Sequence, residues 1–264
     1  MIKMKGEGSM DIKAKVQEQF GKNADNYITS PIHAKGKDLE LMVMLSNATA
    51  QDRVLDIATG GGHTANAFSP HVKEVTALDL TSEILVAAKR FINEQGRDNV
   101  SFVQGDAENL PFEKESFELV TCRIAPHHFP DVKAFVSEAF RVLVPGGRFL
   151  LIDNTAPEIL EYDQFYNHVE KKRDPSHYRA WKKSEWLQLF EETGFTFEQM
   201  HAFKKDFAFD SWCSRMQLAS KDKEELENDM LSPSERVKEY FMIKEKEGHV
   251  QAFTGDAVFI KARK

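Results

Sequence analysis

The chain has 264 residues, of which 41% are hydrophobic and 29% charged, a composition typical of a soluble globular protein with a full core. The formal net charge of −7 disfavours a nucleic-acid partner, which usually requires a basic face. Two cysteines give neither a disulfide framework nor a zinc-ligand spacing, and we find no 18-residue apolar run or signal peptide. We therefore expect a cytoplasmic protein with no membrane span and no metal site.

Residues 1–9 contain two glycines and no periodic pattern, so we expect a flexible leader or a cloning remnant. One domain, 10–264, should follow. It begins with a helix from Asp11 to about Phe20, and residues 37–46 predict a second helix. Between these helices lies a polar stretch with a single aromatic residue, Tyr27, which could either pack into the protein or close over a ligand.

The stretch 54–64 predicts a buried strand, a turn of three glycines and the start of a helix. Glycine tolerates positive φ and lets a ligand approach the backbone closely. The free N–H groups at the start of the helix would then face that ligand. We therefore expect a binding site at this turn.

Further strands are predicted at 74–80, 100–104, 117–122 and 148–153, and the long helices between them cover 82–95 and 131–143. Strands that alternate with helices at this spacing indicate a parallel, doubly wound α/β sheet.

Residues 154–180 look helical, and a helix at 185–193 and a sixth strand at 195–201 follow. Two or three charged helices are then expected within 210–247. A last strand at 257–262 would return to the sheet as its antiparallel member, which makes seven strands.

Three acids end successive strands: Asp56, Asp79 and Asp106. In an open α/β sheet, ligands bind beyond the carboxyl ends of the strands, so these acids should converge on one crevice. An adenosine group would explain them, because one carboxylate can bind the two ribose hydroxyls.

The glycine turn by itself is compatible with two classes of cofactor. Gly60-x-Gly62-x-x-Ala65, with Asp79 nineteen residues after Gly60, fits the loose dinucleotide fingerprint and favours a nicotinamide-dependent oxidoreductase. The same residues also fit a second pattern, in which Asp56 precedes the first glycine by four positions.

That second pattern resembles motif I of class I S-adenosylmethionine-dependent methyltransferases. The resemblance extends in order over about residues 20–155 and includes Asp79-Leu80, the segments 105–112 and 117–120, and Arg141 to Gly147. The set looks most like the branch of ubiquinone/menaquinone C-methyltransferases and their small-molecule relatives, in which the approach Asn23-Ala24-x-x-Tyr27 also occurs. A dinucleotide enzyme is not expected to combine the Leu-Pro-Phe and Pro-Gly-Gly elements.

The resemblance implies a Rossmann-like methyltransferase fold that binds S-adenosylmethionine through 10–153 and a substrate through 154–264, where added helices form a lid. The cofactor-binding residues that it implies are Tyr27, Asp56, Thr59, Gly60, Gly62, Asp79, Leu80, Asp106, Ala107 and Arg123. Leu80 would lie against the adenine. The alternatives to a catalytic enzyme of this family are the nicotinamide-dependent oxidoreductase and a non-catalytic protein that binds S-adenosylmethionine.

The acceptor of the methyl group should be a small, partly apolar molecule, but no motif identifies it. His127 and His128 follow the fourth strand and are candidates for a general base, although each could equally cap a helix or pack beneath the cofactor. His33 and His63 are expected to be structural. The oligomeric state stays open, a homodimer included.

Aromatic residues after position 155 have two interpretations. They could form a lid over the acceptor, or they could pack the added helices onto the core. The residues concerned are Phe203, Phe207, Phe209, Trp212 and the aromatics from Tyr162 to Trp181.

Overall fold

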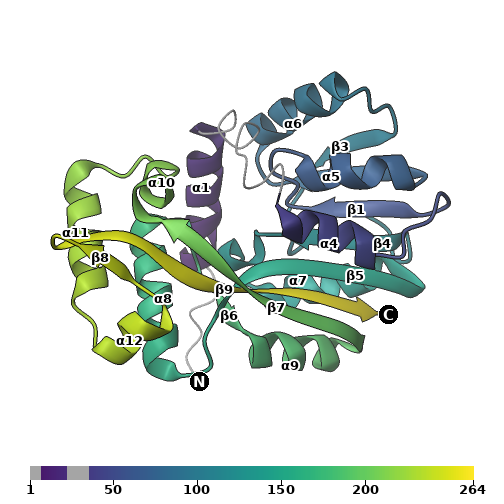
Figure 1. The fold of residues 1–264 in the computed structure, drawn as a ribbon. Helices are drawn as coiled ribbons and strands as arrows, with labels where there is room; N and C mark the ends of the chain where they lie inside the picture. The colour runs from purple at the N-terminus through teal and green to yellow at the C-terminus, as the bar shows by residue number, and fades with distance from the viewer. Residues whose placement is uncertain (1–6, 23–35) are drawn as a thin grey trace.

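The computed structural model describes residues 7–22 and 36–264 (Figure 1). Tyr27 and His33 lie outside this part of the chain, so the role of Tyr27 in a lid stays a prediction. The first described helix, α1 (Glu7–Lys22), begins before the predicted Asp11 and includes the end of the expected leader.

One nine-stranded sheet forms the centre of the molecule, and seven of its strands run in the order β3-β2-β1-β4-β5-β9-β7. The strands from β3 to β5 are parallel, and β9 lies antiparallel between β5 and β7. The predicted doubly wound sheet with an antiparallel last strand is confirmed, and the short β6 and β8 are additions that the sequence analysis missed. The strands are β1 (Arg53–Ile57), β2 (Glu74–Asp79), β3 (Val100–Gln104), β4 (Phe117–Arg123), β5 (Leu143–Ala156), β6 (Trp181–Lys182), β7 (Thr196–Ala208), β8 (Lys244–Lys246) and β9 (His249–Arg263).

Helices cover both faces of the sheet (Figure 1). One face packs against α4 (Lys37–Leu45), α5 (His63–Phe68) and α6 (Ser82–Glu94). The other face packs against α7 (Val132–Val142) and α9 (Lys183–Thr193). In the described part of the chain, none of the helices combines the length and the apolar character needed to cross a membrane.

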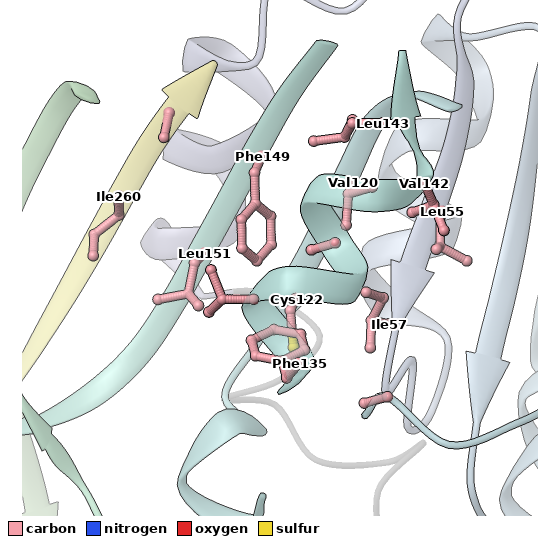
Figure 2. Packing of buried hydrophobic residues seen from close by; sticks show 14 of the residues in the cluster. Leu55, Ile57, Val120, Cys122, Phe135, Val142, Leu143, Phe149, Leu151 and Ile260 are labelled. Carbon is pink, nitrogen blue, oxygen red and sulfur yellow. The ribbon is translucent and has the colours of Figure 1, made fainter. Parts of the chain in front are cut away.

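The alternation of side chains along each strand explains these two layers. Successive residues of a strand point to opposite faces, so Leu55 and Ile57 join one core cluster while Val54 joins the other. Figure 2 shows Leu55 and Ile57 of β1 near side chains of β4 and α7, with those of β5 and then Ile260 of β9 further across the same layer. In the same cluster Phe149 stacks on Phe190 of α9, with ring centroids 5.3 Å apart. Apolar packing on both faces is what holds the strand ends rigidly beside one another.

A second helical layer covers the extensions of β7 and β9 and consists of α8 (Leu160–Arg173), α10 (Phe209–Ser214), α11 (Ser220–Leu231) and α12 (Glu235–Tyr240). Phe207, Phe209 and Trp212 are buried there with residues of α8 and α11. Of the two interpretations of these aromatics, their burial favours packing of the added helices.

The region after residue 154 differs most from the expectation. The predicted helix at 154–180 is wrong at both ends: β5 continues to Ala156, and α8 ends at Arg173. Asp174 precedes Pro175, and a residue before proline is disfavoured in the helical conformation, which explains where α8 stops. The strands β7 and β9 are also longer than predicted because their ladder continues to the pair Ala208 and Ala252.

We expect Gly62→Ala to destabilise the protein by about 1–3 kcal/mol more than Gly96→Ala. Both glycines have positive φ, +81° and +71°, so both substitutions introduce similar backbone strain. A Cβ on Gly62 would lie 2.9 Å from Cδ1 of Ile92, whereas one on Gly96 would meet nothing within 4 Å. Urea unfolding of both variants measures the difference, and equal losses would contradict the steric argument.

Candidate functional site

The turn between β1 and α5 leaves its backbone open to a ligand. Ala58, Gly60 and Gly62 all have positive φ, at 54°, 54° and 81°. A Cβ placed on Gly60 would meet no atom of residues 7–22 or 36–264 within 4 Å, so this part of the chain leaves the space over Gly60 unfilled. Gly62 lies at the N-terminus of α5 and instead packs against α6. The two predicted glycines therefore differ in position, with Gly60 facing the site and Gly62 closing the turn.

Asp79, at the end of β2, holds this turn in place. Its Oδ2 accepts a hydrogen bond of 3.0 Å from the N–H of Gly60, and its Oδ1 accepts one of 3.0 Å from Thr81. The side chain is 7% exposed, and burial raises the pKa of this carboxyl above its usual value. A nearly buried carboxylate that remains at the edge of an open turn is suited to bind a pair of hydroxyl groups.

Asp56 lies below the turn and is only 1% exposed. Its two oxygens accept hydrogen bonds from the hydroxyls of Thr59, at 2.6 Å, and Thr121, at 2.8 Å. Burial raises the pKa of Asp56 to about 6, although both threonine hydroxyls act against the shift. In this arrangement Asp56 positions Thr59, and direct contact between Asp56 and a cofactor stays a prediction.

The opposite wall of the site comes from the end of β3 and from α1. Nζ of Lys13, on α1, lies 2.6 Å from Oδ2 of Asp106 and 2.5 Å from Oε2 of Glu108. The side-chain amide of Gln17 also donates to the carbonyl of Leu80. The sequence analysis did not identify Lys13, because no local pattern links it to an acid that lies 93 residues further along the chain.

Together these elements enclose a cleft of about 950 Å³, which includes its open mouth. The cleft brings together eight of the predicted site residues: Thr59, Gly60, Asp79, Leu80, Asp106, Ala107, Arg123 and His128. Lys13 and Val16 of α1 also line it.

Arg123, the last residue of β4, lines the cleft but directs its guanidinium to Asp38 on α4. Nε of Arg123 lies 2.9 Å from Oδ2 of Asp38. A second hydrogen bond, from Nη2 to Oδ1, makes the pair bidentate. The Arg123 guanidinium keeps the pKa of Asp38 below its usual value although burial opposes this. The next residue, Ile124, has a φ of 56°, which is unusual for a β-branched side chain. The chain thus turns sharply at the end of β4.

Two buried histidines follow this turn on a short 3₁₀ helix, Pro126–His128. Nδ1 of His127 lies 2.6 Å from Oδ1 of Asp153, and Nδ1 of His128 lies 3.1 Å from the carbonyl of Ser176. The two imidazole centroids are 4.3 Å apart. His128 lines the cleft, and His127 is the next group behind it.

The environments of the two histidines push their pKa values in opposite directions. Burial disfavours the charged form of His127, but the Asp153 carboxylate outweighs it and raises the pKa of His127. Burial and the charge of His127 lower the pKa of His128 to about 4. A separation of this kind is typical of an acid–base site, and it makes His127 the more basic of the two imidazoles.

Known proteins with similar sequences and structures indicate the family. A family model described as a methyltransferase domain matches residues 55–151. The uncharacterized methyltransferase YcgJ of Bacillus subtilis is 45% identical over 74% of this chain and 78% of its own length. The chain belongs to the methyltransferases.

Two further relatives of this methyltransferase support the assignment. The demethylmenaquinone methyltransferase of Lactococcus lactis is 32% identical over 66% of this chain and 73% of its own. The crystal structure of the BH2331 protein of Bacillus halodurans C-125 superposes with a TM-score of 0.85, with 50% identity over 87% of this chain and 99% of that one. The predicted resemblance to the ubiquinone/menaquinone branch is confirmed, and the methyltransferase interpretation of the glycine turn is favoured over the nicotinamide alternative.

We expect NMR titration to separate the two histidines of this methyltransferase. His127 should titrate above its ordinary pKa of about 6.5, and His128 should titrate near 4. In Asp153→Asn the pKa of His127 should fall, because the negative charge beside Nδ1 is gone. A His127 pKa that does not change in this variant would contradict the role given to Asp153.

We also expect Asp56 to make stability depend on pH. Its pKa in the folded state, about 6, exceeds its ordinary value of 3.8. The stability contributed by the protonated carboxyl is therefore full below pH 3.8 and lost as the pH rises through 6. Relative to Asp56→Asn, the wild type should lose roughly 2.5 kcal/mol of unfolding free energy between pH 4 and pH 7.

Chemical denaturation at both pH values measures this change, and Asp98→Asn, which removes an exposed acid, serves as the control. If the gap between wild type and Asp56→Asn is the same at pH 4 and pH 7, the buried carboxyl does not titrate as argued.

Proposed function

We propose that this protein transfers a methyl group from S-adenosylmethionine to a small-molecule acceptor. The observation that carries the proposal is the Asp79 carboxylate, which lies at a strand end beside an open glycine turn and faces a cleft. A carboxylate in this position can accept hydrogen bonds from both hydroxyls of the cofactor ribose.

The residues of the cleft fit the rest of the cofactor. The unfilled space over Gly60 accommodates a group that approaches the backbone. Leu80 and Ala107 give apolar walls for the adenine ring, and the acids Asp79 and Asp106 suit a molecule that carries a positive sulfonium. Membership of the methyltransferases disfavours the nicotinamide alternative.

S-adenosylmethionine supplies a methyl group that is already activated by the sulfonium. The chain therefore contributes mainly position and the exclusion of water. In our proposal residues 10–153 hold the cofactor and residues 154–264 contribute to the acceptor site. His127 takes up a proton on its imidazole where the acceptor must lose one, and Asp153 holds the ring in place.

The acceptor in this proposal is a small molecule and not a nucleic acid. The net charge of −7 supports this, since binding of the phosphate backbone relies on lysine and arginine. A non-catalytic protein that only binds the cofactor remains the competing interpretation, and the detection of methyl transfer distinguishes the two.

We expect Asp79→Asn to weaken the binding of S-adenosylmethionine about tenfold to a hundredfold. The loss of charge removes about 1.5–3 kcal/mol of charge-assisted hydrogen bonding to the ribose. Titration calorimetry with S-adenosylmethionine measures the effect, and Asp98→Asn is again the control. The fold should persist, because the asparagine oxygen can still accept one of the two backbone hydrogen bonds.

The same calorimeter tests the choice of cofactor. Wild-type protein should bind S-adenosylmethionine at micromolar concentration and give no heat with NAD. Tight binding of NAD without heat from S-adenosylmethionine would overturn the proposal in favour of the dinucleotide class.

A further inference from the structure

The helix α1 covers the part of the cofactor cleft that lies beyond the ends of β2 and β3 (Figure 1). Lys13 and Val16 line the cleft, and the side-chain amide of Gln17 donates a hydrogen bond of 3.2 Å to the carbonyl of Leu80. Residues three and four positions apart share one face of a helix, so α1 turns a single face toward the cleft.

Lys13 connects this face to the loop after β3 through two carboxylates. Its Nζ lies 2.6 Å from Oδ2 of Asp106 and 2.5 Å from Oε2 of Glu108. Burial disfavours the charged ammonium, but its hydrogen bonds to the two carboxylates outweigh burial and raise the pKa of Lys13. The ammonium is therefore charged at neutral pH, and both ion pairs are formed.

The two carboxylates are positioned by the domain and not by α1. Oδ1 of Asp106 accepts a hydrogen bond of 2.9 Å from the N–H of Glu108. Oε1 of Glu108 accepts one of 2.7 Å from the N–H of Asp131, the residue that caps α7. Each acid thus uses one oxygen within the domain and the other for Lys13, so Lys13 can leave while the acids stay in place.

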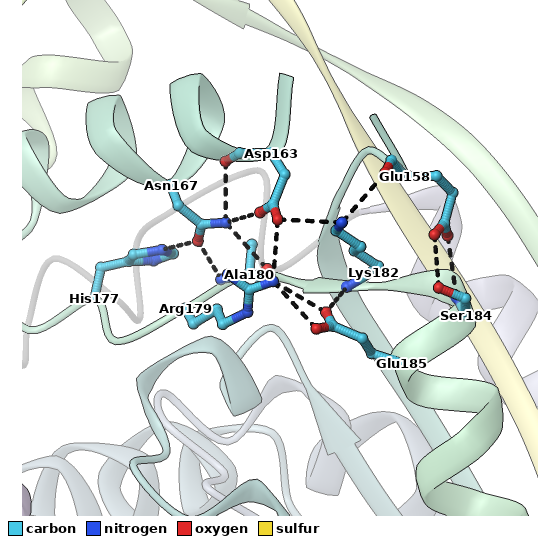
Figure 3. Close-up of polar contacts among 9 residues, drawn as sticks. All are labelled: Glu158, Asp163, Asn167, His177, Arg179, Ala180, Lys182, Ser184 and Glu185. Atoms are coloured by element: carbon cyan, nitrogen blue, oxygen red, sulfur yellow. Dashed lines mark hydrogen bonds and ion pairs between the residues drawn. The ribbon is translucent and has the colours of Figure 1, made fainter. Parts of the chain in front are cut away.

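Little apolar surface holds α1 on the domain. Among the α1 side chains that the structure describes, 12–19 and 21, only Ile12 is buried. By comparison, α8 buries five side chains, and Asp163 and Asn167 also bind it to the segment that follows (Figure 3). Elements with few buried apolar contacts open at a lower free energy than the rest of a domain. Polar contacts such as those of Lys13 and Gln17 therefore matter more for the attachment of α1 than apolar burial does.

We propose that α1 is a movable cover of the cofactor cleft and that Lys13 is the latch that holds it closed. The inference rests on the proposed function only in taking S-adenosylmethionine as the molecule that enters. The latch is closed with and without the cofactor, and both the cofactor and its demethylated product pass when the ion pairs of Lys13 open. A closed cover also keeps water away from the methyl group during transfer.

Hydrogen exchange of the free protein tests the latch without any ligand. Lys13→Met keeps a long unbranched side chain and removes the charge. The amides of α1 should exchange about threefold to tenfold faster in this variant, the effect expected for a partly exposed network of ion pairs. The amides of β1 and β4 should keep their wild-type rates. Lys89→Met, which removes an exposed charge from the neighbouring helix α6, is the matched control and should change neither set.

The rates of cofactor binding test the cover. Association of S-[methyl-³H]adenosylmethionine is followed directly, and its release is followed after addition of excess unlabelled cofactor. Lys13→Met should raise both rates by about threefold to tenfold and leave the dissociation constant within about twofold of the wild type. Sodium chloride should accelerate release from the wild type more steeply than from this variant, because salt screens partly exposed ion pairs. Lys13→Arg keeps the charge and should behave as the wild type.

Faster release without faster association would overturn the proposal, because the affinity would then fall and Lys13 would be a direct contact of the cofactor. Unchanged exchange of α1 in Lys13→Met would overturn it as well. Absence of S-adenosylmethionine binding to the wild type would mean that the proposed function has failed, whereas faster exchange of α1 in the same experiment would still show that Lys13 holds the helix closed.

Discussion

The hydrogen bonds of one buried carboxylate, Asp56, connect the parts on which the site depends. The residue is the last but one of β1, and its two oxygens join Thr59 of the glycine turn to Thr121 of β4. The turn is therefore fixed relative to the central strands and not only to its own helix. Burial makes the charged form of Asp56 costly and so raises its pKa to about 6. The two threonine hydroxyls offset part of that cost. The open backbone over Gly60 is maintained by an interaction that is itself hidden from the ligand.

The half of the chain that precedes residue 154 could be predicted from the sequence because its signals are local. Apolar runs, glycines and strand-terminal acids follow one another at short spacing, and the sheet then brings Asp79 and Asp106 to the same edge. Among the predicted residues that line the cleft, Gly60, Asp79 and Asp106 were found in this way. Others, such as Thr59 and Leu80, came from the resemblance to the methyltransferase family. The local sequence does not show that Gly60 faces the cleft while Gly62 closes the turn, since the packing of Gly62 depends on Ile92 of a later helix.

The remainder could not be predicted, because it depends on contacts between distant segments. Lys13 reaches an acid 93 residues away, and Asp153 becomes the partner of His127 only when β5 and β4 are adjacent. The end of α8 was signalled by Pro175, but helical composition obscured it. The aromatics of the second helical layer were equally ambiguous, since a buried tryptophan and a ligand-facing one look alike in a sequence.

In both halves of the molecule, hydrogen bonds of polar side chains fix the arrangement of neighbouring segments. Around the glycine turn, Asp56 and Asp79 bind their own chain, so the cofactor cleft is already ordered in the free protein. Around α8, Asp163 and Asn167 bond to each other and to the segment that follows the helix, so these hydrogen bonds position the second helical layer.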